Sequence, residues 1–141
     1  MIYRLYTEPD DNGTLLVTCP AFPEVTTFAD GPDGVVARGT AAIEEAIAAR
    51  IADGQDIPAP DAVSGRRGKV LARLPIMTAM KVQLYNELRR SKVKTRAELA
   101  RRMGKSRETV DRLFRLDHAS KTDQIESAFR ALGKEVEFRI L

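Results

Sequence analysis

Hydrophobic and polar residues alternate at the start of the chain, which is the pattern of a strand with one buried face. Residues 2–8 alternate around Tyr3 and Leu5, and the sequence Asp-Asp-Asn-Gly follows at 10–13. Asn and Gly tolerate the positive φ that tight hairpin turns require. We therefore expect a first strand, a turn, and a second strand that returns over 14–19.

A third strand is predicted after an interruption by two prolines. Pro20-Ala21-Phe22-Pro23 breaks the pattern, because proline cannot donate a hydrogen bond to a sheet ladder. Residues 25–28, Val-Thr-Thr-Phe, are β-branched or aromatic and favour a strand. The first part of the chain is thus expected to form a three-stranded meander.

An amphipathic helix and a fourth strand follow. Pro32 and Asp33 suit the first turn of a helix, which should run to about Ala52. The apolar stripe that should pack on the sheet repeats every four residues and consists of Ile43, Ile47 and Ile51. A proline-rich connection that reaches Ser64-Gly65 leads to an alternating segment over 69–74, which reads as a strand.

The pattern changes to helical spacing after Pro75, and we place a domain boundary there. A first helix is followed by three short helical segments, and residues 135–141 then alternate as a final strand. The predicted fold class is α+β. It combines a β-β-β-α-β domain over 1–75 with a helical domain over 76–141 that ends in a strand.

Charge is divided unevenly between these two parts. The whole chain has a net charge of +3, but residues 1–64 carry eleven carboxylates against three arginines, a net charge of −8. With the boundary at residue 75, the first domain has a net charge of −4 and the second a net charge of +7. This separation indicates a polyanion as the partner of the C-terminal domain and a basic partner for the N-terminal domain.

Composition argues against several classes of protein. The single cysteine, Cys19, cannot form an internal disulfide, and the single histidine, His118, leaves no ligand set for zinc. The apolar runs are too short to span a membrane and the start lacks a signal peptide, so we expect a cytoplasmic protein without a membrane partner. Arg4 is the one charge inside the first strand, where a two-metal nuclease would need a carboxylate. We therefore expect no enzyme, no metal and no cofactor.

Residues 95–115 have the pattern of a helix-turn-helix. Thr95 and Glu98 form a capping box, in which the Thr95 hydroxyl accepts from the Glu98 amide and the Glu98 carboxylate reaches back to the Thr95 amide. Gly104 suits the left-handed turn that ends this helix, and Ser106 can cap the next one. The second helix has two apolar positions that should face the core, Val110 and Leu113.

The second helix of the pair is the candidate reader of DNA bases. Ser106 and Arg107 stand at its N-terminus, where base contacts are usually made, and Arg112 lies further along it. The side chains expected on phosphates are Thr95, Arg101, Arg102 and Lys105. Glu108 and Asp111 would repel phosphates unless such a carboxylate accepts from cytosine N4 or holds an arginine in place, and we expect the arginine role. The alternative is a helical hairpin with a solvated basic face.

The order of these features over nearly the whole chain resembles the HicB family of antitoxins, in the version that carries a helix-turn-helix. The segments behind the resemblance are Pro20 to Pro23, Glu44-Glu45-Ala46, Gly54 followed by Ile57 to Pro60, and Leu99-Ala100 to Leu113. Glu24 and Val25 stand where the family commonly has glycine and cysteine.

The resemblance implies a partial ribonuclease H-like N-terminal fold that binds and blocks HicA, a small basic toxin that cleaves messenger RNA. It also implies that the C-terminal domain represses the shared operon by binding operator DNA. The acidic N-terminal domain agrees with a basic partner. The residues expected in the toxin contact are Phe22, Pro23, Glu24 and Asp30, with a position in the core as the alternative for Phe22.

Assembly is expected because one helix-turn-helix covers only a half-site, so that a homodimer or higher oligomer would read a palindrome with half-sites about 34 Å apart. The final strand could pair across a twofold axis through Val136, Phe138 and Ile140. The alternative is that this strand folds back on its own domain. For the function, the alternatives are a stand-alone regulator whose N-terminal domain senses a small molecule, and a nuclease.

Overall fold

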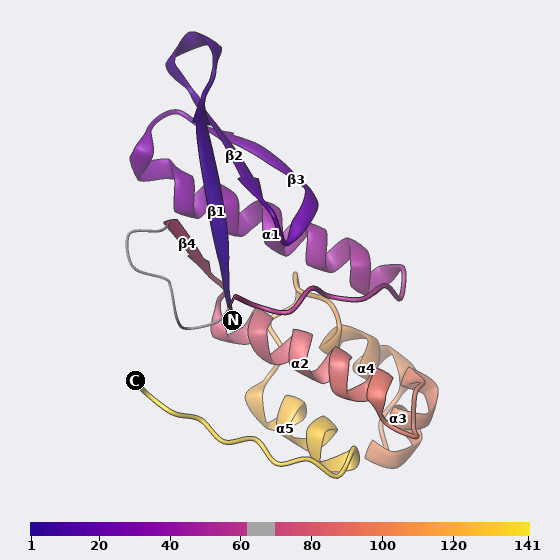
Figure 1. The fold of residues 1–141 in the computed structure, drawn as a ribbon. Helices are drawn as coiled ribbons and strands as arrows, with labels where there is room; N and C mark the ends of the chain where they lie inside the picture. Colours follow the sequence, from indigo (N-terminus) through magenta and orange to yellow (C-terminus); the bar gives the residue numbers. More distant parts are fainter. Residues whose placement is uncertain (62–69) are drawn as a thin grey trace. The chain divides into compact units, whose positions relative to one another are not determined.

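The computed structural model describes residues 1–61 and 70–141. These residues form two compact units, Met1–Pro75 and Ile76–Leu141 (Figure 1). The predicted connection at Ser64-Gly65 and the predicted start of the fourth strand at Lys69 lie outside the described residues.

The first unit contains an antiparallel sheet in the order β3-β2-β1-β4. Its strands are β1 (Ile2–Pro9), β2 (Leu15–Cys19), β3 (Phe22–Ala29) and β4 (Val70–Arg73). The turn between β1 and β2 is the short 3-10 helix η1 (Asp11–Gly13), in which Asn12 has φ +67° and Gly13 has φ +74°. The prediction of a hairpin turn with positive φ is therefore confirmed.

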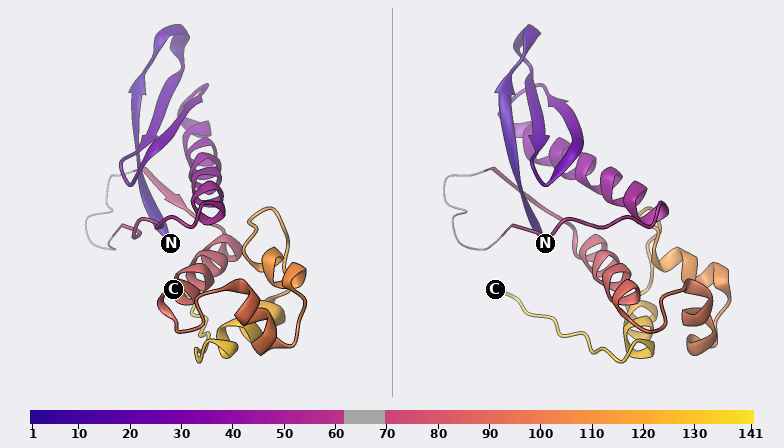
Figure 2. Two further views of the ribbon diagram at one scale, coloured as in Figure 1. Left: turned by 90° about the vertical axis from the view of Figure 1, so that its right-hand side faces the viewer. Right: turned by 45° about the vertical axis from the view of Figure 1, so that its right-hand side comes forward.

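Helix α1 (Val35–Ala52) follows the 3-10 turn η2 (Pro32–Gly34) and covers one face of this sheet (Figure 2). The predicted stripe is confirmed, because Ile43, Ile47 and Ile51 are all buried. At Gly39 the helix approaches β1 so closely that a Cβ would overlap the side chain of Leu5. A glycine is therefore needed there for the helix to reach the sheet.

Strand β3 begins three residues earlier than the sequence predicts. Only Pro20 and Ala21 form the turn, and Cys19 pairs with Phe22 across it. The register then shifts, so that Thr18 pairs with Thr26 and the residues between, Pro23 among them, bulge from the ladder. Because β3 is at an edge of the sheet, the missing N–H of Pro23 costs little.

The second unit contains four helices in its described residues. They are α2 (Ile76–Arg90), α3 (Arg96–Met103), α4 (Arg107–Leu113) and α5 (Thr122–Ala131). Helix α5 packs against α2 and α3, and α3 packs against α4. Leu84 of α2, Leu99 of α3 and Ile125 of α5 meet in a core in which each is almost fully buried.

The predicted strand over 135–141 does not form within the chain. These residues have no regular structure and all are exposed, and Phe138 and Ile140 expose 67% and 88% of their surface. The prediction of a strand is therefore wrong for the single chain, and so is the alternative that it folds back on the helices. A strand needs a neighbour for its backbone hydrogen bonds, and the second unit offers none among its described elements.

No helix in residues 1–61 or 70–141 is long and apolar enough to cross a membrane.

Candidate nucleic-acid interface

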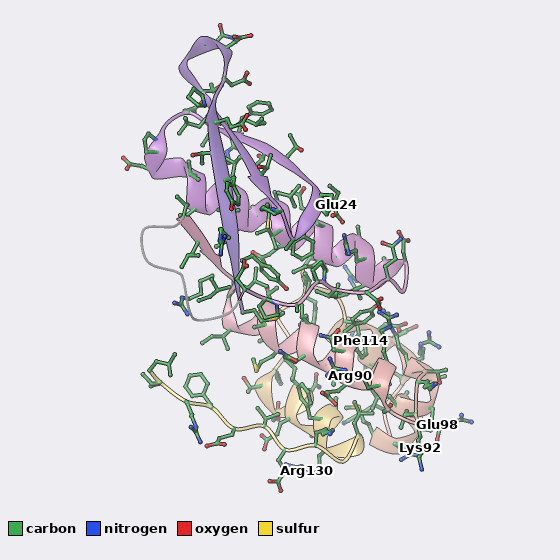
Figure 3. All side chains as sticks on the ribbon, viewed as in Figure 1. Glu24, Arg90, Lys92, Glu98, Phe114 and Arg130 are labelled. Atoms are coloured by element: carbon green, nitrogen blue, oxygen red, sulfur yellow. The ribbon has the colours of Figure 1, made fainter. Side chains whose placement is uncertain are left out.

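The first helix of the predicted helix-turn-helix is capped by Thr95. The Thr95 hydroxyl accepts a hydrogen bond from the Glu98 amide over 3.2 Å, as the capping box requires. The reciprocal bond is absent, because the Thr95 amide donates to the Val93 carbonyl over 2.7 Å instead. Glu98 forms ion pairs with Arg101 and Arg102 of its own helix instead. Figure 3 labels Glu98.

Gly104 ends α3 in the left-handed conformation, with φ +64° and ψ +33°. The amide of Lys105 then bonds back to the Ala100 carbonyl over 3.0 Å, so the turn satisfies carbonyls at the end of α3. Ser106 caps α4, and its hydroxyl accepts from the Thr109 amide over 3.1 Å. Both predicted roles are confirmed.

The two apolar residues of α4 fix which way its arginines face. Val110 and Leu113 are fully buried, as the spacing predicts. The side chains of Arg107 and Arg112 therefore leave the helix on its outer side, and Arg107 exposes 57% of its side chain. On α3, Arg101 and Arg102 expose 76% and 51% of their side chains. All four cations are accessible to a large anion.

Asp111 organises the arginines around α4. Its Oδ1 accepts from Arg107 Nε over 3.0 Å and from Arg96 Nη1 over 3.3 Å. Arg96 also lies over the Phe114 ring, with its guanidinium carbon 4.8 Å from the centroid, so it connects the start of α3 to the end of α4. The expectation that a carboxylate holds an arginine in place is confirmed for Asp111, whereas Glu108 is exposed.

The pKa of Asp111 reports this arrangement. Partial burial raises the pKa, but the hydrogen bonds from Arg107 and Arg96 lower it by more, so the net pKa lies below the usual range of an aspartate. Asp111 is thus ionised at neutral pH. It holds Arg107, which is available to a ligand, and Arg96, which is largely structural.

Sequence reasoning missed three cations next to this site. Lys92 and Lys94 lie in the connection that leads into α3, and Arg96 is the first residue of α3 (Figure 3 labels Lys92). Lys94 adopts φ +59°, the left-handed region, immediately before the cap residue Thr95. Their position beside a helix N-terminus is a signal for phosphate contact that the sequence already carried.

The residues predicted for toxin contact differ in burial, because Phe22 is in the core and the other three are exposed. Phe22 is fully buried, and its ring meets the Tyr3 ring edge-on with centroids 5.0 Å apart. Its predicted toxin contact is therefore wrong, because the ring is part of the core between sheet and α1. Pro23 and Glu24 are exposed near the start of β3, whereas Asp30 is exposed just past its end, roughly 20 Å further along an extended strand.

Glu24 is held by Arg50 from the last turn of α1 (Figure 3 labels Glu24). Arg50 Nε and Nη2 donate to the two carboxylate oxygens over 2.7 and 2.9 Å, and Nη1 donates to the Asp56 carbonyl over 2.9 Å. The guanidinium also lies over the Phe22 ring, 5.3 Å from its centroid. The hydrogen bond from Arg50 lowers the pKa of Glu24, which stays ionised but shares its charge with a cation.

The residues that the structure describes contain no group of three His, Cys, Asp or Glu side chains close enough to hold a metal ion. Cys19 is buried in the core of the first unit, and burial raises the pKa of its thiol.

Comparison with known proteins places the chain in a family. The profile of the HicB_like antitoxin family of bacterial toxin-antitoxin systems matches residues 2–83, which is more than half of the chain. The chain belongs to the HicB-like antitoxin family. The matched segment covers the first unit and ends inside α2, so α3 and α4 lie outside it.

Curated antitoxins named HicB are similar to this chain over both of its units. Antitoxin HicB of Pseudomonas fluorescens (strain Pf0-1) is 36% identical over 127 residues, covering 90% of this chain and 86% of the relative. Antitoxin HicB of Escherichia coli (strain K12) is 32% identical and covers 96% of each chain. Antitoxin HicB 1 of Photorhabdus laumondii subsp. laumondii is 31% identical, covering 99% of this chain and 87% of the relative.

Proposed function

We propose that this antitoxin blocks a small basic toxin that cleaves messenger RNA and represses its own operon by binding operator DNA. We assign toxin binding to the first unit, Met1–Pro75, and DNA binding to the second unit, Ile76–Leu141. The observation that carries the DNA-binding half is the geometry of α3, the Gly104 turn and α4. In it Leu99, Val110 and Leu113 are buried. The exposed arginines are Arg101, Arg102, Arg107 and Arg112.

DNA binding needs two kinds of contact, and this surface can supply both. Several cations are needed because affinity depends on neutralising phosphates, and base identity is read by a few side chains in the major groove. Arg101, Arg102 and Lys105 are exposed on α3 and its turn, where phosphate contact is expected. Arg107 and Arg112 are exposed on α4, the proposed reading helix. The Thr95 hydroxyl accepts the capping bond and can still donate its proton to a phosphate oxygen, whereas the Ser106 hydroxyl also bonds to the Thr109 hydroxyl over 2.9 Å.

The test of DNA binding compares two arginine variants on the DNA that precedes the antitoxin's own gene. Arg107→Ala is expected to weaken binding by about 1–3 kcal/mol, because a bidentate arginine contact to a guanine is worth that much. Arg130→Ala is the matched control, since Arg130 is exposed on α5 and pairs with Glu126 away from α4. Both affinities are measured by fluorescence anisotropy at one salt concentration. Equal, small losses for the two variants would contradict the proposal, as would equal wild-type affinity for unrelated DNA.

Toxin binding is proposed for the acidic first unit. The net charge of −4 over residues 1–75 favours association with a basic protein, and family membership implies a toxin partner. Pro23, Glu24 and Asp30 are exposed and remain the proposed contacts. Because Glu24 lies near the start of β3 and Asp30 just past its end, the toxin would have to lie along that edge strand to reach both.

The toxin contact is tested by co-purification with the product of the adjoining reading frame. Glu24→Lys combined with Asp30→Lys is expected to lower recovery of a small basic partner, because both changes put cations where the partner is basic. Asp10→Lys combined with Asp11→Lys is the control, since it changes the net charge equally at the exposed β1–β2 turn. Recovery that is lost equally in both double variants would show an effect of net charge and not of these two contacts.

A homodimer or higher oligomer is part of the same proposal. Two helix-turn-helix units are needed to read a palindrome with half-sites about 34 Å apart. Val136, Phe138 and Ile140 are exposed in a tail that has no regular structure, and pairing of two such tails would bury them and supply the missing strand neighbour.

A further inference from the structure

Lys81 is the one charged residue that is buried in the described part of the chain, and it lies in α2 behind the proposed DNA-binding surface. Its relative exposure is 0%. A lysine without a partner is among the most unfavourable groups to bury. The burial of Lys81 therefore needs a structural explanation.

The ammonium group of Lys81 is fully hydrogen-bonded to backbone carbonyls. It donates to the carbonyl of Arg112 over 3.0 Å, to that of Arg115 over 2.6 Å and to that of His118 over 2.6 Å. An ammonium has three protons, and three acceptors satisfy all of them. The acceptors are the last turn of α4 and the loop that follows it, so one side chain of α2 binds three points of the chain beyond the reading helix.

The positive charge of Lys81 is stabilised by backbone carbonyls and not by a bound carboxylate. The carbonyls at a helix C-terminus carry the negative end of the helix dipole, and a cation there is stabilised. Burial lowers the pKa of Lys81, the charge of Asp117 raises it and that of Arg115 lowers it, so the net pKa lies below the usual range of a lysine. The buried hydroxyl of Ser120 also donates to the Arg112 carbonyl, over 3.4 Å.

We propose that Lys81 is a positioning residue for DNA reading, which fixes the C-terminal end of α4 and the loop over 114–118 to α2. The proposal rests on the proposed function of α4. A helix of seven residues has too few internal hydrogen bonds to fix its own ends, and its N-terminal end is already fixed by the Ser106 cap and the Gly104 turn. Lys81 supplies the second point of attachment. Base contacts depend on the exact placement of Arg107 and Arg112, whereas contacts to phosphates tolerate displacement.

The test is the ratio between affinity for operator DNA and affinity for unrelated DNA. Lys81→Met keeps an unbranched side chain, one heavy atom shorter, but has no donor. It is expected to lower this ratio about tenfold while affinity for unrelated DNA stays within about twofold. Lys121→Met is the matched control, because Lys121 is exposed beside α5 and loses the same charge. A destabilised fold would lower both affinities together, so the ratio separates positioning from stability.

Amide hydrogen exchange gives a second readout that needs no DNA. In Lys81→Met the amides of His118 and Ser120 are expected to exchange faster than in the wild type, while amides in the middle of α2 and α5 keep their protection. Lys81→Gln, whose amide group keeps two protons to donate, is expected to give an intermediate result in both measurements.

Each outcome decides the proposal. An unchanged affinity ratio with unchanged exchange at His118 and Ser120 would overturn it. Failure of both Lys81→Met and Lys81→Gln to fold at low temperature would also overturn it, because Lys81 would then be required for the fold of the whole unit. If the wild-type chain shows no preference for its operator, the proposed function fails. The exchange data then still test whether Lys81 fixes the end of α4.

Discussion

Arginines in both units are held by carboxylates in defined geometry, and this decides what each arginine can do. Arg50 has its Glu24 partner, a carbonyl and the Phe22 ring, so its three contacts fix the end of α1 to the start of β3. Arg107 shares Asp111 with Arg96 and remains more than half exposed. An arginine with one partner and free surface can bind a ligand, whereas one with every face occupied stabilises the fold.

A pH-dependent contribution to stability is predicted for Glu24. Its pKa is lowered by Arg50, so the stabilisation is present above the ordinary glutamate pKa and is lost as the pH falls through the lowered value. Glu24→Gln should therefore lower the free energy of unfolding at pH 7 by about 0.5 kcal/mol, a small value because the pair is partly exposed. The difference from the wild type should be smaller at pH 3 than at pH 7, because more of the Glu24 carboxylate is protonated there.

Urea unfolding at the two pH values measures this effect, with Glu45→Gln as the control. Glu45 is exposed on the same helix, α1, and the substitution removes one charge just as Glu24→Gln does. A loss in Glu24→Gln that is as large at pH 3 as at pH 7 would mean that packing, and not the charge on Glu24, supplies the stability.

At the scale of elements, the helix-turn-helix gets its precision from packing and capping together. Helices α3 and α4 have eight and seven residues, too short to be stable alone in water. Leu99, Val110 and Leu113 are fully buried and hold the pair against the rest of the unit. The caps at Thr95, Gly104 and Ser106 then set where each helix begins and ends.

The exposed C-terminal tail carries the prediction for assembly. Removal of residues 134–141 is expected to convert a dimer into a monomer, because the apolar side chains of the tail have no cover within the chain. Sedimentation velocity measures the change, and operator affinity should fall with it, since two half-sites no longer act together. A full-length variant with serine at Val136, Phe138 and Ile140 is the companion, because it keeps the tail and removes only its apolar surface. A truncated chain that sediments as a dimer would refute this route of assembly.

At the scale of the whole molecule, the chain joins two compact units of opposite net charge. The first, Met1–Pro75, has a net charge of −4 and the second, Ile76–Leu141, a net charge of +7. Each has its own buried core, the first between sheet and α1 and the second among the four helices. Such units can carry separate binding activities, because a domain with its own core can fold and bind a partner by itself.

Separate expression of the two units tests this division. Residues 76–141 alone should prefer operator DNA, with log affinity falling by about 0.9 per phosphate contact for each tenfold rise in salt. Lys105→Ala should reduce that slope by about one contact, since Lys105 is exposed in the turn between α3 and α4. Anisotropy titrations at several salt concentrations measure both slopes. DNA binding that needs residues 1–75 would contradict the assignment of this activity to the second unit.

Local sequence patterns determined most of the secondary structure and the turn chemistry of the candidate site. The stripe of Ile43, Ile47 and Ile51, the positive φ at Asn12, Gly13 and Gly104, and the Ser106 cap all follow from residues within one turn or one element of each other. The burial of Val110 and Leu113 was predicted in the same way, from their spacing alone.

Tertiary structure alone decided the contacts between distant parts of the sequence. Lys81 lies 31 to 37 positions from the carbonyls it binds, Arg96 lies 15 positions from Asp111, and Glu24 lies 26 positions from Arg50. The burial of Phe22 and the missing partner of the C-terminal tail also depend on what packs beside them. Periodicity shows which face of a segment is apolar. The partner of a given side chain depends on how helices and strands cross in space, and the spacing within one segment does not determine that.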